Sequence, residues 1–259
     1  MKRPTTKKAA LLAAWLAFML VSAAVGQEPK TIKLNEPNKR RGLPLMETLS
    51  VRASATEWSD KGLSLQDLSD LLWAADGVNR PESGKRTASS AMNAQDVDIY
   101  VFMNTGAFLY DAKAHALVSV VAGDLRSEIL PARPAGGPQA KPGEKPAEKP
   151  TTGQPPAKPA GPPPGAPGAK PGPPQPASAP ILLVLVSDVS RFRGGSPELK
   201  LEWAAIDTGI VSQNISLFCA ATGLATRPRS SMDREKIHSL LKLTETQHPL
   251  LNHPVGYKK

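Results

Sequence analysis

The sequence predicts an α+β fold, and three observations lead to this class. Three short stretches with alternating or apolar patterns, at 97–103, 107–112 and 115–122, have the features of strands. A continuous apolar run comes much later, at Ile181–Val189, and a long helical pattern follows it. Strands and helices that are grouped in this way, without regular alternation, are typical of α+β proteins.

Two helices are expected before the first strand. The stretch GLPLMETLSVRAS predicts a short helix that ends near Val51. The stretch LSLQDLSDLLWAADG predicts a longer one, because Ser64 is followed three residues later by Asp67, as at a capped helix start. Leucines at helical spacing then form an apolar stripe, and Gly77 is expected to end this helix.

The strands at 107–112 and 115–122 are separated by only two residues, which predicts a hairpin. GDLRSEIL, residues 123–130, is expected to begin a further helix. Ile181–Val189 is apolar throughout and is therefore expected to be a central strand buried on both faces.

The C-terminal part is expected to hold two helices and a strand. A long helix is predicted from Glu198 to Thr222, with Gly223 at its end. A second helix is expected at 232–243, capped by Ser231, and PLLN at 249–252 is expected to be a short last strand.

Residues 131–180 differ from the rest of the chain in composition. They contain 18 of the 27 prolines and no aromatic or large aliphatic residue. Such a segment cannot bury enough surface to offset its ordering entropy, so we expect a disordered loop with polyproline II character. Residues 181–259 offer too little sheet to cover their own helices. We therefore expect one discontinuous domain formed by 27–130 and 181–259.

The first 26 residues have the layout of a cleavable secretory signal. A basic start precedes a largely apolar run at 9–25, and the small residues Ala24 and Gly26 stand just before Gln27. We expect a periplasmic or secreted protein without a membrane span after cleavage. The alternative is an uncleaved anchor, for which a run of 17 residues is barely long enough.

The net charge of +9 suggests nucleic-acid binding at first sight, but its distribution excludes this class of partner. Residues 1–26 and 131–180 each supply four of the nine net positive charges. The predicted globular body is therefore nearly neutral and lacks the basic surface that binds phosphate backbones.

The sequence has no self-contained catalytic motif. Its four histidines are scattered without ligand spacing, so no metal site is expected, and no nucleophile elbow, Walker A motif or dinucleotide fingerprint occurs. Cys219 lies in an apolar helical stretch and is expected to be a buried, inert thiol. Asp188 and Asp207 could act as bases, but neither has an identifiable partner. If the protein is an enzyme, a cofactor carries the chemistry.

The stretch TASSAMNAQ, residues 87–95, is poor in large side chains and precedes the strand at 97–103. One interpretation is a surface on which a planar ligand lies, close to the backbone and with amide groups at its rim. The other is an ordinary Ser/Thr/Asn-rich loop that enters a strand.

Four motifs in order favour the ligand surface. They are RASATEW at 52–58, SSAMNAQ at 89–95, the helix containing Gln213 and Asn214 with GLAT at 223–226 after it, and HPVGYKK at the chain end. Together they resemble the nitroreductase-like FMN-dependent oxidoreductases, particularly the branch with the SagB-type thiazoline and oxazoline dehydrogenases. This resemblance implies a mixed sheet flanked by helices, bound FMN, and a homodimer with two FMN sites at the subunit interface.

The resemblance also implies the residues of the cofactor site. Arg52 and Ser54 match a basic-x-Ser-x-basic motif that holds the FMN phosphate and ribityl chain, while Thr56 stands where a cation is usual. The other implied contacts are to the ring, from Ser90, Ala91, Asn93, Gly223, Leu224 and Ala225, and to the phosphate, from Lys258.

Two functions remain open at this point. The first is an exported FMN-dependent oxidoreductase that acts on an unidentified small substrate. The family usually draws hydride from NAD(P)H, which is scarce outside the cytoplasm. The alternative is a catalytically idle member of the fold that serves as a binding or envelope-spacing protein through its proline-rich segment.

Overall fold

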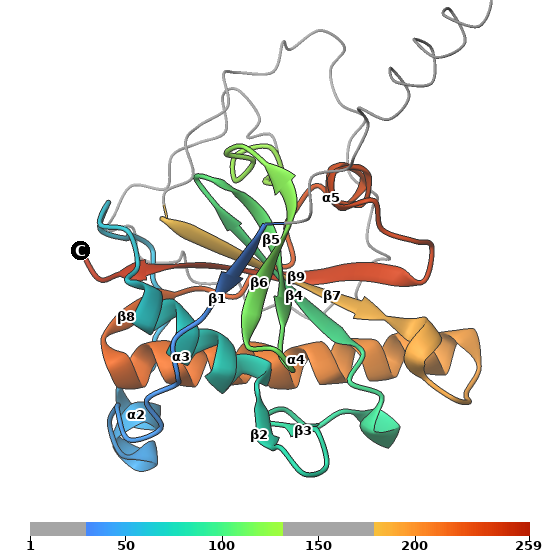
Figure 1. The fold of residues 1–259 in the computed structure, drawn as a ribbon, viewed down its shortest axis with the longest axis horizontal. Coiled ribbons are helices and arrows are strands. Elements are labelled where there is room, and N and C mark those ends of the chain that lie inside the picture. The colour runs from blue at the N-terminus through green and yellow to red at the C-terminus, as the bar shows by residue number, and fades with distance from the viewer. Residues whose placement is uncertain (1–29, 132–178) are drawn as a thin grey trace, which may run out of the picture.

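The computed structural model describes residues 30–131 and 179–259 (Figure 1). The expected signal at 1–26 lies outside the described residues, and so does all of the proline-rich segment except residues 131, 179 and 180. The described parts confirm an α+β fold in which helices flank one large sheet.

Both parts of the chain build the same seven-stranded sheet, in the order β1-β6-β5-β4-β7-β9-β8. Residues 30–131 supply β1 (Thr31–Lys33), β4 (Val97–Met103), β5 (Gly106–Asp111) and β6 (Ala116–Ala122). Residues 179–259 supply β7 (Ile181–Asp188), β8 (Leu224–Thr226) and β9 (Gln247–Tyr257). Every pairing between neighbouring strands of this sheet is antiparallel, so in the described residues the expected mixed sheet is an antiparallel one.

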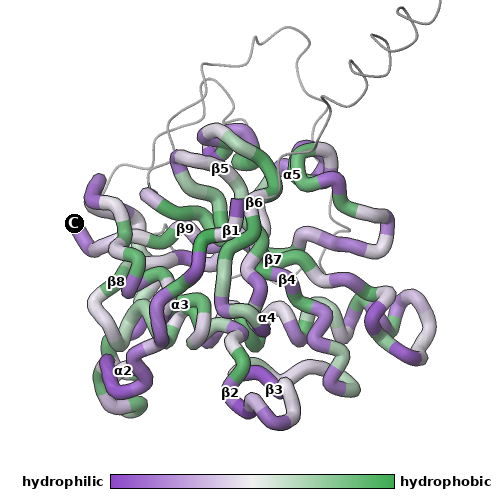
Figure 2. The backbone as a smooth tube through the Cα atoms, in the orientation of Figure 1, coloured by the Kyte–Doolittle hydropathy of each residue, from purple (hydrophilic) through white to green (hydrophobic). Residues whose placement is uncertain are grey.

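The central strand β7 explains why its sequence is apolar throughout. It pairs with β4 on one side and β9 on the other, and its first seven residues are all buried. Ile181, Leu183 and Leu185 belong to one hydrophobic core, and Leu182, Val184 and Val186 belong to the other. The central strands are accordingly largely green, which marks hydrophobic residues, in Figure 2.

Different elements cover the two faces of the sheet. Helices α3 (Leu65–Asp76) and α4 (Pro197–Thr222) pack on one face, where α4 runs along the whole width of the sheet (Figure 1). Helix α5 (Arg234–Leu241) packs on the opposite face through Ile237 and Leu241.

The N-terminal helices agree with the sequence pattern. Helix α2 spans Leu45–Val51, and α3 begins after Ser64, whose hydroxyl accepts a hydrogen bond from the Asp67 amide at 3.1 Å. Gly77 follows the last residue of α3 as expected. Short elements that the sequence did not predict are β1, β8, β2 (Val78–Arg80), β3 (Lys85–Arg86) and the 3-10 turns η1 (Ala91–Asn93) and η2 (Val189–Arg191).

The predicted long helix is confirmed as α4, which begins after Ser196 and ends at Gly223. Gly223 adopts a φ of 77°, a left-handed conformation that glycine reaches without strain. The predicted cap of the next helix is wrong: α5 begins after Asp233, not Ser231, because the Asp233 carboxylate accepts the Lys236 amide.

The predicted helix at 123–130 is also wrong, since these residues form turns. Their backbone is used for contacts with other segments. The Ile129 carbonyl accepts the Asp233 amide, and the Ile129 side chain is fully buried on the α5 face of the sheet. Pro131 follows directly and disfavours a helical conformation at the residue before it.

The last strand is longer than the predicted 249–252. β9 has 11 residues and pairs with both β7 and β8. Pro249 obscures it in the sequence because proline cannot donate to a sheet ladder. In the structure, Pro249 lies where the register between β7 and β9 shifts, which is a position that tolerates proline.

Candidate functional site

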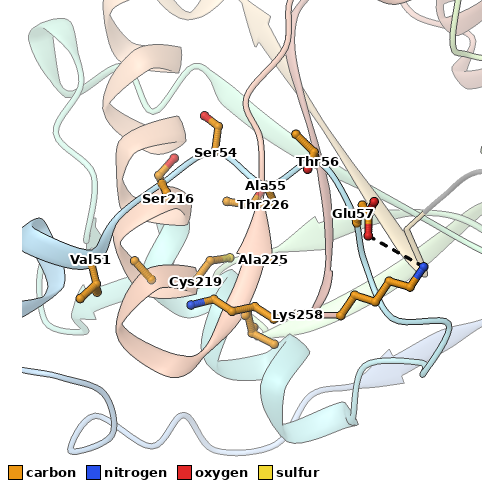
Figure 3. A pocket seen from close by; sticks show the side chains of 14 residues that line it. Val51, Ser54, Ala55, Thr56, Glu57, Ser216, Cys219, Ala225, Thr226 and Lys258 are labelled. Carbon is orange, nitrogen blue, oxygen red and sulfur yellow. Dashed lines mark ion pairs between the residues drawn. The ribbon is translucent and has the colours of Figure 1, made fainter. Parts of the chain in front are cut away.

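A cavity of about 310 Å³ opens near the C-terminal end of α4. We call it the Ser54 cavity. The segment after α2, the last turns of α4, strand β8 and the chain end surround it (Figure 3). Its lining residues are Val51, Ala53, Ser54, Ala55, Thr56, Glu57, Ser216, Cys219, Ala220, Leu224, Ala225, Thr226, Lys258 and Lys259.

The segment after α2 is fixed over strand β8 by hydrogen bonds. The Ala55 amide donates to the Thr226 carbonyl at 2.9 Å, and the Trp58 indole N–H donates to the Ala225 carbonyl at 2.9 Å. Trp58 is buried, so its side chain holds this segment against the rest of the fold. The hydroxyl groups of Ser54 and Thr56 are thereby held at the cavity while their side chains remain exposed.

The cavity combines a polar rim with a floor of small apolar side chains. Ser54, Thr56 and Ser216 contribute hydroxyl groups, and Lys258 extends toward α4 (Figure 3). Lys259 forms an ion pair with Glu57 at 3.8 Å. Both side chains are exposed, so this ion pair contributes little to stability. Such a lining suits a ligand with a flat apolar part and an anionic or polar end.

Cys219 lies in the floor and is 1% exposed. Burial raises the pKa of its thiol far above the ordinary value, so the sulfur stays protonated. This agrees with the inert thiol that the sequence predicts, because the thiolate is the reactive form of cysteine.

Most predicted site residues gather at this cavity. Ser54, Thr56, Leu224, Ala225 and Lys258 line it. Arg52 lies between two lining residues, and its exposed side chain forms no hydrogen bond or ion pair with any residue that the structure describes. Gly223 ends α4 directly before the lining residue Leu224.

Ser90, Ala91 and Asn93 lie elsewhere in the chain's fold. The Ala91 amide donates to the Asp207 carboxylate at 2.8 Å, near the middle of α4. Asp207 precedes the lining residue Ser216 by nine residues, a separation of about 14 Å along the helix at 1.5 Å per residue. In one copy of the chain, the Ser90 tract therefore does not line the Ser54 cavity.

The segment 90–95, which we call the Ser90 tract, has a strained backbone. Met92, Asn93 and Gln95 adopt positive φ angles of 53°, 53° and 49°. A left-handed non-glycine residue costs on the order of 1 to 3 kcal/mol and persists only when its surroundings impose it. Such strain is typical of ligand-binding segments.

Side chains and backbone contacts impose this conformation. The Ser90 hydroxyl accepts the Gln95 amide at 2.8 Å, and the Gln95 carboxamide donates to the Gly84 carbonyl at 3.0 Å. The Arg191 guanidinium donates to the Gln95 carbonyl at 2.8 Å. The tract is thus tied to α4, η2 and the β2–β3 turn.

A buried polar network lies next to the Ser54 cavity. Thr226 donates its hydroxyl proton to the Pro254 carbonyl, so it accepts a hydrogen bond from Nδ1 of His253 at 3.2 Å. The Ser212 hydroxyl then donates to Nε2 of His253 at 2.8 Å. Burial and the charge of Arg229 lower the pKa of His253 to about 3, so the ring is neutral and positions Thr226.

The motifs alone did not identify Ser216 and Ala220, because they lie inside an apolar helix without a signature. Their helical spacing, four residues apart and near Cys219, was the available signal. In the described ranges, no group of three or more His, Cys, Asp or Glu side chains could hold a metal ion. A helix long and apolar enough to cross a membrane is likewise absent from the described ranges.

Comparison with known proteins places this geometry in a family. Residues 49–257 match the sequence profile of the nitroreductase family. A nitroreductase homologue of Methanocaldococcus jannaschii is 25% identical over 222 residues, which are 83% of this chain and 92% of that protein.

Solved structures of other proteins have a similar fold. A crystal structure of a nitroreductase homologue from Ralstonia eutropha matches with a TM-score of 0.67 and 29% identity, over 91% of this chain and 93% of that chain. The Escherichia coli microcin synthetase McbBCD complex matches with a TM-score of 0.57 and 16% identity, over 92% and 81% of the two chains. The latter similarity shows a shared fold.

Proposed function

The chain belongs to the nitroreductase family, and from this premise we propose that it is an exported, FMN-dependent oxidoreductase that works as a homodimer. Family membership implies oxidoreductase activity. The observation that carries the finer proposal is the Ser54 cavity, which gathers predicted phosphate and ring contacts from distant parts of the sequence.

The residues present fit FMN. The cavity volume of about 310 Å³ falls within the range of small-molecule sites. Arg52, Lys258 and the Ser54 hydroxyl would bind the phosphate and ribityl chain, since guanidinium and ammonium groups form strong charge-assisted hydrogen bonds with phosphate. The small side chains of Ala220 and Ala225 leave room for a flat ring. When bound, FMN supplies reversible electron and hydride transfer at its N5 atom.

A second copy of the chain would complete the site. In a two-fold symmetric dimer, identical α4 helices can pack antiparallel on each other. If the axis crosses α4 midway between Asp207 and Ser216, the partner's Ser90 and the rest of its tract come to lie beside the Ser54 cavity of this chain.

The outer face of α4 supports this packing. Ile206 is 53% exposed, although it is a large hydrophobic residue. Gly209 lies next to it, and a Cβ there would meet no atom within 4 Å, so another helix has room to approach. The exposed or half-buried residues of this face are Ala205, Ile206, Gly209, Ile210, Gln213 and Leu217. Exposed apolar side chains that gather on one helix face in this way are typical of protein–protein interfaces, which supports the proposed dimer.

The catalytically idle alternative is favoured by one feature of the cavity. Thr56 stands where the family motif has a cation, and Glu57 adds a carboxylate to the lining. Losing one charged hydrogen bond weakens a phosphate site by about 1.5 to 3 kcal/mol, which reduces affinity without abolishing it. We therefore favour the enzyme.

Flavin retention separates the two functions. The protein is purified from the exported fraction and titrated with FMN, with flavin fluorescence and visible absorbance as readouts. Saturable binding of one FMN per chain, and reduction of the bound flavin by dithionite, support the proposal. Absence of binding, in a protein whose circular dichroism shows the native fold, would establish the idle alternative.

A further inference from the structure

Two buried carboxyl groups meet beneath the Ser90 tract. Asp96 precedes β4 and is fully buried, and Asp207 lies on α4 with 3% exposure. The two carboxyl groups are within hydrogen-bond reach of each other. Together with Ser89, Ser90 and other residues they line a small cavity under the tract.

The donors available to this pair are too few for two ionised groups. Asp96 Oδ2 accepts the Ser187 hydroxyl, and Asp207 Oδ2 accepts the Ala91 amide at 2.8 Å. Asp96 Oδ1 is buried and has no hydrogen-bond partner among the residues that the structure describes. Two carboxylates would meet there acceptor to acceptor, whereas one proton converts the contact into a hydrogen bond.

The surrounding charged groups do not supply a replacement for this proton. Asp76 is paired with Arg86, and Asp98 is paired with Arg191. Arg191 faces Asp96 at longer range and is also shared with Asp188. Burial, opposed by the Ser187 hydroxyl and reinforced by Asp207, raises the pKa of Asp96 to about 7. The charged or titratable groups around the pair are therefore Asp76, Arg86, Asp98, Asp188 and Arg191.

We propose that Asp96 carries a proton that it donates to the carboxylate of Asp207, and that Asp207, held in place by this hydrogen bond, is the positioning residue that fixes the Ser90 tract for the flavin. The link to flavin rests on the proposed function. Asp207 reaches the tract at the Ala91 amide, directly before the left-handed residues Met92 and Asn93.

Loss of the shared proton has a definite consequence. Above neutral pH the two negative charges repel, Asp207 moves away from Asp96, and its contact with the Ala91 amide is released. The strained turn then loses one of the contacts that impose it. Flavin affinity is expected to fall as Asp96 ionises.

Two variants at Asp207 test this proposal, and they are expected to change FMN binding in opposite ways. In Asp207→Asn, the amide nitrogen supplies a permanent hydrogen to Asp96, and the amide oxygen still accepts from Ala91. In Asp207→Ala, both contacts are lost. Because every protein meets the same FMN, ionisation of the ligand cancels when dissociation constants are compared at one pH.

We expect the ratio of the wild-type FMN dissociation constant to that of Asp207→Asn to rise roughly tenfold between pH 6 and pH 8.5, as for a single coupled proton. Asp207→Ala should bind FMN weakly at both pH values. A constant ratio would overturn the proposal. Asp96→Asn supplies the same permanent hydrogen from the other side, so it should reproduce the pH-independent behaviour if Asp207→Asn fails to fold.

A flavin-free measurement separates this proposal from the proposed function. In the wild-type protein without flavin, the NMR signal of the Ala91 amide should shift with a midpoint near neutral pH, and the amide variants should abolish this shift. Asp76→Asn is the matched control, since Asp76 lines the same small cavity, and it should keep the shift. Loss of the shift in this control, or no shift in the wild type, would refute the shared proton even if FMN binds.

Discussion

The proposed role of Arg52 in binding the FMN phosphate can be tested directly. Its side chain is exposed beside the Ser54 cavity and forms no ion pair with a described residue. Its guanidinium is therefore free either to bind a phosphate or to remain solvated, and substitution distinguishes the two.

We predict that Arg52→Ala raises the FMN dissociation constant by roughly 10 to 150-fold, because one charged hydrogen bond contributes about 1.5 to 3 kcal/mol. Riboflavin has the same ring without the phosphate, so its affinity should hardly change. Titration of both flavins by fluorescence quenching measures the difference. Arg40→Ala, which removes another exposed arginine, is the control and should change neither affinity. Equal losses for both flavins would exclude a phosphate contact.

His253 gives a pH prediction whose sign follows from its burial. Its pKa is lowered to about 3 in the folded chain, against about 6.5 when unfolded. The unfolded chain therefore binds a proton first as pH falls, and the stability that His253 contributes above pH 6.5 is lost toward pH 3. Asp76 and Asp96, whose pKa values are raised to about 7, act in the opposite direction.

His253→Gln removes this titration and leaves the two aspartates unchanged. Between pH 7.5 and pH 5, the wild type should lose about 2 kcal/mol of unfolding free energy relative to the variant, at 1.36 kcal/mol per pH unit. Urea unfolding at several pH values measures both curves. Parallel curves would mean that His253 is protonated in the folded protein.

A residue of the site could be predicted from the sequence only where it stands in a recognisable motif. Ser54 and Lys258 could be found because each stands in a short pattern. Ser216 and Ala220 stand in no such pattern and belong to the same cavity through the packing of α4. The contact between Asp96 and Asp207 joins residues 111 positions apart, and local sequence carries no signal for it.

At the scale of elements, local capping decided what could be predicted. Helix α3 has a complete signature, in which the Ser64 hydroxyl also donates to the Asp67 carboxylate at 2.6 Å. The helix expected at 123–130 failed because Arg126 uses its guanidinium to bind the carbonyls of Ala179 and Pro180, at 3.1 and 2.7 Å. Those partners are the last two residues of the proline-rich segment, so tertiary contacts overrode local preference.

The cap of α3 can be tested alone. We predict that Ser64→Ala destabilises the fold by about 1 kcal/mol, the usual cost of losing an N-cap hydroxyl. Chemical denaturation at pH 7 measures this value. Ser83→Ala, in the exposed turn between β2 and β3, should cost less than about 0.5 kcal/mol. A Ser64 variant as stable as the wild type would show that the Asp67 contacts with Arg41 and Tyr257 fix α3 without the cap.

At the scale of the whole molecule, the sequence predicted the central strands of the sheet, and the family resemblance implied FMN sites at a subunit interface. In the fold, the α4 residues next to the Ser90 tract and the Ser54 cavity, Asp207 and Ser216, lie nine positions apart, which is about a third of the helix. The proposed second copy of the chain would cover the exposed apolar residues of α4, such as Ile206, and would join the two halves of the site.

Complementation between two defective chains tests this central claim most directly. Arg52→Ala impairs the cavity, and Ala91→Trp blocks the tract with a bulky side chain. If each FMN site combines the cavity of one chain with the tract of the other, a mixed dimer has one intact site. It should bind one FMN at a concentration where neither parent variant binds. If mixed dimers form and bind no FMN above the level of the parents, the site is not built from two chains, and the account is contradicted.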